Sequence, residues 1–186
     1  MTTWILLAII VVVALAGVAA YNRLVSLRQR CRQSFSDIDV QLKQRHDLVP
    51  NLVETVKGYA AHEKDTLQAV VAARNAAVGA QGLSNQAQAE GQLSAALGRL
   101  IALSEAYPDL KANQSFVTLQ TQLESIEDKI AAARRFFNNT AAEFNAARES
   151  FPAVLFAASL GFAPQTFFEL EASERASVAT PPAVKF

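Results

Sequence analysis

The N-terminal stretch differs from the rest of the chain in its hydrophobic pattern. Residues Trp4 to Ala20 are almost continuously apolar, and no side chain from Met1 to Asn22 is charged. This run is close to the roughly 20 residues that a helix needs to cross the hydrocarbon core of a bilayer. Trp4 and Tyr21 bracket it, as amphipathic rings do at the two headgroup levels. The pattern predicts a transmembrane anchor over residues 1–22, with Trp4 and Tyr21 in contact with the membrane.

Beyond the anchor, apolar residues recur at steps of three and four, which is the spacing of one helix face. Four such stripes follow one another: Leu24, Leu27, Cys31, Phe35, Ile38 and Leu42; Leu52, Val56, Tyr59, Leu67, Val70 and Val71; Leu93, Leu97, Leu100, Leu103 and Tyr107; and Phe116, Leu119, Leu123, Ile126, Ile130, Ala133, Phe137, Thr140, Phe144, Ala147 and Phe151. The fourth has the steps of a left-handed helix pair. We therefore predict an all-α fold, with an antiparallel up-and-down four-helix bundle over residues 23–152.

Glycine and proline mark the ends of these helices. Gly79 and Gly82 lie in a polar connection, and Pro108 and Pro152 interrupt the later helical patterns. Each proline disfavours the helical conformation of the residue before it. We expect helix boundaries at all three places.

The segment around Pro50 admits two interpretations. The apolar positions on either side of it stay in phase, which allows one kinked helix. A helix from Asn22 to Val78 would be about 85 Å long, however, and the remaining helices are too short to cover it. A turn at Arg45 to Val49 makes two helices of similar length, with Asp47 as a cap and Pro50 in the first turn. We favour the turn.

The bundle topology returns the fourth helix to the bilayer. The segment that follows, residues 153–170, begins with an uncharged apolar run from Ala153 to Phe162 that is too short to span. Either this run contacts the headgroup region through Phe156, Leu160 and Phe162, or it folds back and caps the bundle core.

Residues 171–186 form a C-terminal tail that we expect to be extended, because it is rich in small residues and proline. Val184 and Phe186 alternate at strand spacing. Either the tail lacks fixed structure, or Val184 and Phe186 dock on the bundle or on a neighbouring subunit.

Composition and charge narrow the function. The 186 residues are a one-domain length, and the hydrophobic fraction of 51% with a mean hydropathy of +0.15 fits a chain with a membrane segment. Seventeen basic and seventeen acidic residues cancel, which gives no case for nucleic-acid binding. The single cysteine, Cys31, excludes an intrachain disulfide and lies on an apolar stripe, so we expect it to be buried.

The basic residues predict the orientation of the anchor. Arg23, Arg28, Arg30 and Arg32 follow the apolar run. The positive-inside rule then places the bundle in the cytoplasm and the N-terminus outside the cytoplasmic membrane. A cleaved signal peptide is the competing interpretation, but the basic residues that precede such a peptide's apolar run are missing.

Residues 41–68, QLKQRHDLVPNLVETVKGYAAHEKDTLQ, are the richest in candidate chemistry. His62 and Glu63 begin a zinc-protease motif, but Thr66 stands where the second histidine is required. Neither histidine has a glutamate three residues before it, as a di-iron bundle needs. We predict no enzyme activity, no metal and no cofactor.

The charges of the same segment allow two interpretations. They form either a solvated face or a docking surface for another protein at the distal end of the bundle. The docking surface would consist of Arg45, His46, Asp47, Asn51 and Glu54.

The segment 41–68 belongs to a longer series of motifs. The others are Tyr21 to Val25, Asp37 to Lys43, Ala106 to Asn113, Phe136 to Asn138 and the closing PAVKF. Together they resemble the LemA family of bacterial membrane-anchored helical proteins over nearly the whole chain. The resemblance implies a helical bundle and a membrane role, and it implies no reaction.

These observations predict a non-enzymatic scaffold of the bacterial cytoplasmic membrane. It would contact the lipid bilayer, self-associate as a homo-oligomer and organise or remodel the membrane. The alternative is an adaptor that docks a membrane protease or a signalling protein, and a small-ligand or metal-binding bundle is the third possibility.

Overall fold

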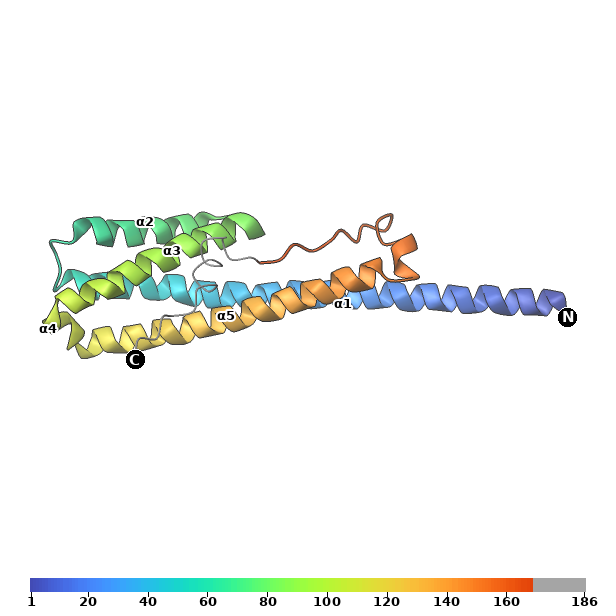
Figure 1. Cartoon of the computed structure of the whole chain (residues 1–186), viewed down its shortest axis with the longest axis horizontal. Coiled ribbons are helices and arrows are strands. Elements are labelled where there is room, and N and C mark those ends of the chain that lie inside the picture. The colour runs from blue at the N-terminus through green and yellow to red at the C-terminus, as the bar shows by residue number, and fades with distance from the viewer. Residues whose placement is uncertain (169–186) are drawn as a thin grey trace, which may run out of the picture. The chain divides into compact units, whose positions relative to one another are not determined.

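The computed structural model describes residues 1–168, and these contain helices, turns and irregular segments but no β-strand (Figure 1). The all-α prediction is confirmed. The helices are α1 (Thr2–Lys57), α2 (Lys64–Gly79), α3 (Leu83–Leu103), η1 (Ser104–Ala106), α4 (Pro108–Lys111), α5 (Gln114–Glu149) and η2 (Ala153–Leu155). The described chain divides into two compact units. Unit 1 comprises Met1–Asp39 and Ala132–Phe167, and unit 2 comprises Val40–Ala131 and Phe168.

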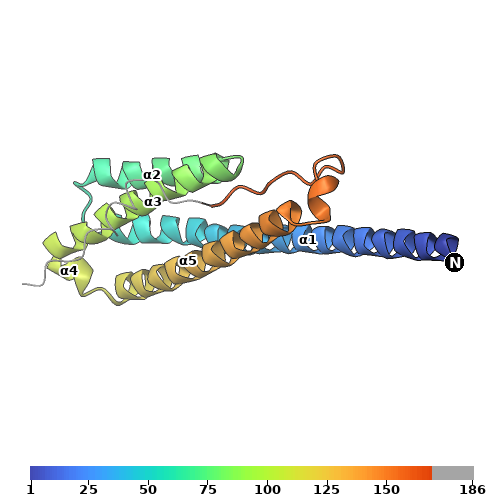
Figure 2. The ribbon, with the colours of Figure 1, turned by 45° about the vertical axis from the view of Figure 1, so that its right-hand side comes forward.

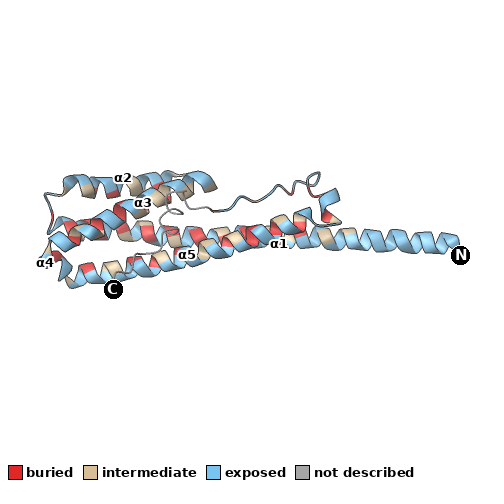
Figure 3. Ribbon diagram, in the orientation of Figure 1, coloured by how far each residue is buried: buried red, intermediate tan, exposed pale blue. Residues whose placement is uncertain are grey.

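The N-terminal part of α1 belongs to unit 1 and leaves its apolar side chains uncovered. Trp4 is 75% exposed, and the residues up to Val18 are exposed almost throughout (Figure 3). Among residues 1–168, α1 is the one helix that is long and apolar enough to cross a membrane. A continuous apolar helix surface of this kind is unfavourable in water, because apolar area is stabilised by removal from water.

The core of unit 1 begins directly after the apolar run. Leu24, Leu27 and Cys31 of α1 pack with Phe144 and Ala147 of α5 and with three residues of the segment that follows α5, namely Ala153, Ala157 and Phe162. Cys31 is buried, as predicted. The C-terminal end of α5 therefore lies beside the first turns of α1 that follow the apolar run.

Unit 2 has a separate core to which five helices contribute, since Leu110 of α4 joins residues of α1, α2, α3 and α5. Its buried residues include Val49, Leu52 and Val56 of α1, Leu67 and Val70 of α2, Leu93, Leu97 and Leu100 of α3, and Phe116 and Leu123 of α5. Most of the residues of the predicted stripes are buried, which confirms the helical periodicity. Tyr59, Val71 and Phe151 are exceptions, since all three are exposed.

The predicted turn at Arg45 to Val49 is wrong. α1 continues through Pro50 to Lys57, Asp47 caps nothing, and the chain turns at residues 58–63. Proline has no N–H, so the carbonyl of His46 lacks its usual partner four residues later. The side chain of Arg74 in α2 replaces that partner, because its Nε donates a hydrogen bond to the His46 carbonyl oxygen at 2.8 Å.

The other predicted boundaries are confirmed. α2 ends at Gly79, and Gly82, with a φ of 82°, precedes α3. Pro108 opens α4, and α5 ends at Glu149 before a cis Phe151–Pro152 bond. A single four-helix bundle over residues 23–152 is not confirmed, because α2 and α3 belong to unit 2 alone.

Candidate functional site

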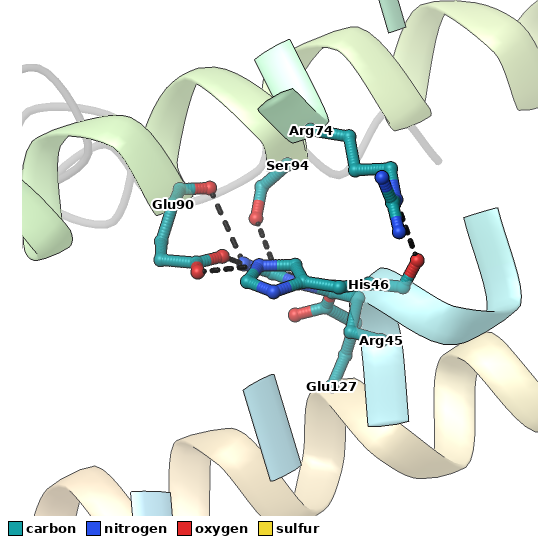
Figure 4. A network of polar contacts seen from close by, with 6 residues as sticks. All are labelled: Arg45, His46, Arg74, Glu90, Ser94 and Glu127. Carbon is teal, nitrogen blue, oxygen red and sulfur yellow. Dashed lines mark hydrogen bonds and ion pairs between the residues drawn. The ribbon is translucent and has the colours of Figure 1, made fainter. Parts of the chain in front are cut away.

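Arg45 is the centre of a polar network inside unit 2 (Figure 4). It projects from α1 and is only 2% exposed. Its guanidinium donates hydrogen bonds to the Glu90 carboxylate and to the Ser94 hydroxyl (2.8 Å) on α3. It also donates to Glu127 Oε1 on α5 at 2.7 Å. One buried cation thus joins three helices of the same unit.

Glu90 is the second buried charge of the network. Besides Arg45, it contacts His46, whose Nε2 lies 2.7 Å from Glu90 Oε1. Burial alone would raise the pKa of Glu90, but the hydrogen bond from His46 and the charge of Arg45 outweigh it. The pKa of Glu90 is therefore lower than its ordinary value of 4.5, and this carboxyl stays ionised at neutral pH.

Arg74 completes the network from α2. Its hydrogen bond to the His46 carbonyl places a cation where Pro50 interrupts the hydrogen bonding of α1 (Figure 4). All four long helices thus meet around two consecutive residues, Arg45 and His46. The charges are paired, as buried charges must be if they are not to destabilise the fold.

The residues predicted as a docking surface divide into two groups. Arg45 is buried and His46 is largely buried, so Arg45 is not part of an exposed surface. The reason is that both side chains point into unit 2, toward Glu90. Asp47, Asn51 and Glu54 are exposed. Docking through these three residues stays a prediction.

Two of these accessible residues line a groove. Asp47 and Asn51 of α1 face Thr121, Gln122 and Lys129 of α5 across an open groove of about 530 Å³. Its lining includes Leu48 and Ile126. The groove has one acidic and one basic side chain and belongs wholly to unit 2.

The residues predicted to contact lipid also divide. Trp4, Tyr21 and Leu160 are exposed, and Phe156 is half-buried. Phe162 is 1% exposed and packs in the core of unit 1, so it is not available to lipid. Val184 and Phe186 lie outside the described residues. Within residues 1–168, no group of three or more His, Cys, Asp or Glu side chains is arranged to hold a metal ion.

Sequence reasoning missed Glu90, Ser94, Glu127 and Arg74. A signal for two members of the network was present. Arg45 follows Leu42 by three residues and precedes Val49 by four, and Glu90 precedes Leu93 by three. Both charged residues therefore occupy positions in the phase of an apolar stripe, which places them in the core.

Comparison with known proteins identifies relatives. The model of the LemA family matches residues 34–186. The chain is 26% identical to the magnetosome protein MamQ of Magnetospirillum gryphiswaldense over 87% of this chain and 69% of the relative. It is 25% identical to magnetosome protein MamQ 2 of Paramagnetospirillum magneticum over the same shares. It is 26% identical to protein LemA of Metamycoplasma hominis over 86% of this chain and 73% of the relative.

Proposed function

This chain belongs to the LemA family, and on this basis we propose that it is a non-enzymatic scaffold anchored in the bacterial cytoplasmic membrane, which self-associates and organises or remodels that membrane. The observation that carries the proposal is the exposed apolar start of α1, which continues without interruption into two helical units.

The exposed apolar surface of α1 supports the anchor. A bilayer would cover the side chains from Trp4 to Val18, and no part of the described protein covers them. The exposed residues Arg23, Arg30 and Arg32 follow and favour retention of the units in the cytoplasm, with the N-terminus outside.

The buried network supports a non-enzymatic role. Each carboxylate of the network is used to pair a cation of the protein, and Arg45 and Glu90 are shielded from solvent. Such groups hold helices together and do not present themselves to a substrate. The relatives' names, magnetosome protein and protein LemA, denote no reaction.

Self-association is supported by apolar side chains on exposed helix surfaces. Phe136 of α5 is 52% exposed, and Val71 and Val78 of α2 are also exposed. Self-association is tested on the full-length protein in mild detergent. Light scattering coupled to size separation gives the mass of the particles, and chemical crosslinking gives the number of subunits. We expect a defined oligomer, and particles of monomer mass alone would contradict the proposal.

The alternative is an adaptor that docks a membrane protease or a signalling protein. The groove beside Asp47 and Asn51 favours it, since an open cleft with two opposite charges suits a protein segment. Capture of one stoichiometric partner by the wild type, lost in Asp47→Lys and kept in Lys57→Ala, would support the adaptor. Equal capture by both variants would argue against it.

A further inference from the structure

The segment after α5, residues 151–162, is held firmly against α1 within unit 1. We call it the hook. The ring of Phe162 packs edge-on against Tyr21, with centroids 5.6 Å apart, and the Arg28 guanidinium lies 4.8 Å from the centroid of the Phe162 ring. Arg148 Nε donates a hydrogen bond to the Phe162 carbonyl at 2.9 Å. Figures 1 and 2 both show this segment beside α1.

The chain just beyond the hook is also fixed. Asn145 of α5 bonds the backbone of Gln165 twice, since its Nδ2 donates to the carbonyl and its Oδ1 accepts from the N–H, each at 2.9 Å. The C-terminal end of the hook is therefore bonded to α5 at Phe162 and just beyond it at Gln165, while Phe162 packs on Tyr21 of α1.

Apart from Phe162, the hook has mainly small residues on its core-facing side and large apolar residues on its outer side. The small residues Ala153 and Ala157 point into the core, together with Phe162. The large apolar residues point outward: Phe151 is 80% exposed, Leu155 73%, Leu160 52% and Val154 51%. No residue from Ser150 to Phe168 is charged. Four large exposed apolar side chains between residues 151 and 160, with no charge among them, favour an interaction site.

The position of the hook along α1 indicates what covers this surface. The hook packs on Tyr21, Leu24 and Leu27, which directly follow the apolar run that ends at Ala20. Leu27 is seven residues beyond Ala20, which is about 10 Å along a helix. The headgroup region of a bilayer is about 5–8 Å thick on each side. The hook thus begins at the depth of the headgroups if α1 spans the bilayer.

We propose that the hook is a second lipid contact, which inserts Phe151, Val154, Leu155 and Leu160 into the leaflet from which α1 emerges. This inference rests on the proposed membrane anchor. Large apolar side chains seated at the boundary of headgroups and acyl chains are the typical contact of interfacial segments. Ala20, the last residue of the apolar run, packs against the core that holds the hook, and the exposed Arg23 suits anionic lipids.

A second contact has a mechanical consequence. A single helix can tilt and rotate in a bilayer, because nothing outside the membrane holds it. The hook lies to one side of α1 and is bonded to α5, so its insertion fixes the direction in which unit 1 leans. It also adds apolar volume to one leaflet only, which favours bending of the membrane.

The test uses depth-dependent quenching of tryptophan by brominated lipid. Trp4 is the only tryptophan of the chain, so Trp4→Phe gives a silent background. Leu155→Trp and, separately, Phe151→Trp are introduced into it, and the full-length proteins are reconstituted in vesicles of phosphatidylcholine and phosphatidylglycerol. The matched control is Phe136→Trp, an exposed ring of unit 1 whose neighbour Phe137 packs on Phe35, about 22 Å beyond Ala20.

In vesicles of unmodified lipid, we expect the tryptophan emission of the Leu155→Trp and Phe151→Trp proteins to shift to the blue. In vesicles whose acyl chains are brominated close to the headgroup, we expect this emission to be quenched. The Phe136→Trp protein is expected to show no quenching by brominated lipid. If brominated lipid quenches the tryptophan emission at neither hook position, the inference is overturned. A blue shift without quenching would mean that protein covers the hook, for example a second copy, and would also overturn it.

The wild-type protein separates this inference from the proposed function. Quenching of native Trp4 with no quenching at either hook position leaves the anchor standing and removes the hook contact. No quenching of Trp4 removes the anchor, and the inference with it. Quenching of Trp4 together with both hook positions supports the two proposals.

Discussion

At the scale of single residues, the main polar feature of the core of unit 2 is the buried ion pair of Arg45 and Glu90. Both side chains are almost fully buried, and each has hydrogen-bonding partners beyond the other. Replacing a buried pair by apolar residues is often neutral, whereas removing one partner leaves an uncompensated charge. We therefore expect the pair to contribute more to the choice of one arrangement of helices than to net stability.

Arg45→Leu is predicted to lower the free energy of unfolding by about 3–5 kcal/mol, because it leaves Glu90 buried with only His46 beside it. Adding Glu90→Leu is expected to recover a large part of this loss. Urea denaturation of the full-length protein in mild detergent, followed by circular dichroism, measures both values.

The matched control is the exposed pair of Glu54 and Lys57, whose charged atoms are 3.3 Å apart. Lys57→Ala is expected to cost only about 0.2–0.5 kcal/mol. Equal costs for Lys57→Ala and Arg45→Leu would show that the network is not buried in solution.

Glu90 also predicts how stability depends on pH. Its pKa is lower in the folded protein than its ordinary value of 4.5, so the unfolded chain binds the proton more tightly. The stabilisation is thus complete above about pH 4.5 and is lost as the pH falls through the folded pKa. Thermal melts from about pH 3 to neutral pH are expected to show a shallower acid decline for Glu90→Gln than for the wild type. If the melting temperatures of the two proteins fall equally steeply with falling pH, Glu90 is not the cause of the acid decline.

The burial of Arg45 was predictable in part. Its place in the phase of Leu42 and Val49 indicated a core position, whereas its charge indicated the surface. The partners were not predictable, because Glu90 and Glu127 are 45 and 82 residues away and no local pattern connects them with Arg45.

At the scale of elements, α1 remains one helix because another element supplies the bond that Pro50 removes. Proline inside a helix costs about 3 kcal/mol, partly through the missing hydrogen bond. Arg74 of α2 supplies a donor to the His46 carbonyl. A local rule favoured a turn at this position, and a contact between two helices overrode it.

A double-mutant cycle tests this compensation. Arg74→Met is predicted to cost about 1–3 kcal/mol, because it leaves the His46 carbonyl without a partner. In a Pro50→Ala background the cost is expected to be much smaller, since the introduced alanine supplies its own N–H to that carbonyl. Chemical denaturation of the four proteins gives the coupling energy. Additive costs would show that Arg74 acts elsewhere.

The helix periodicities were predictable, and the boundaries at glycine or proline also emerged from the sequence. The turn at residues 58–63 was not predictable from the sequence, because the stripe residues Leu52, Val56 and Leu67 suggested one continuous helix across it. We expected that the remaining helices would be too short to cover one long helix, and this expectation failed for a physical reason. Two separate cores cover α1, one formed with α5 and the hook, the other with α2, α3 and α5.

At the scale of the whole molecule, the apolar start of α1 and the family match lie on different parts of the chain. The apolar residues before Tyr21 are exposed in the protein, and the family model covers residues 34–186. The role of residues 153–162 was open between a core cap and a membrane contact. The structure shows that Ala153, Ala157 and Phe162 do cap the core of unit 1, while Phe151 and Leu155 face outward.

The central proposal is that the protein is anchored in a membrane and organises it. Electron cryomicroscopy of vesicles that contain the full-length protein tests it most directly. We predict clustered protein of defined subunit number and a change in vesicle curvature where the clusters lie. Evenly dispersed monomers on vesicles of unchanged shape would contradict the claim.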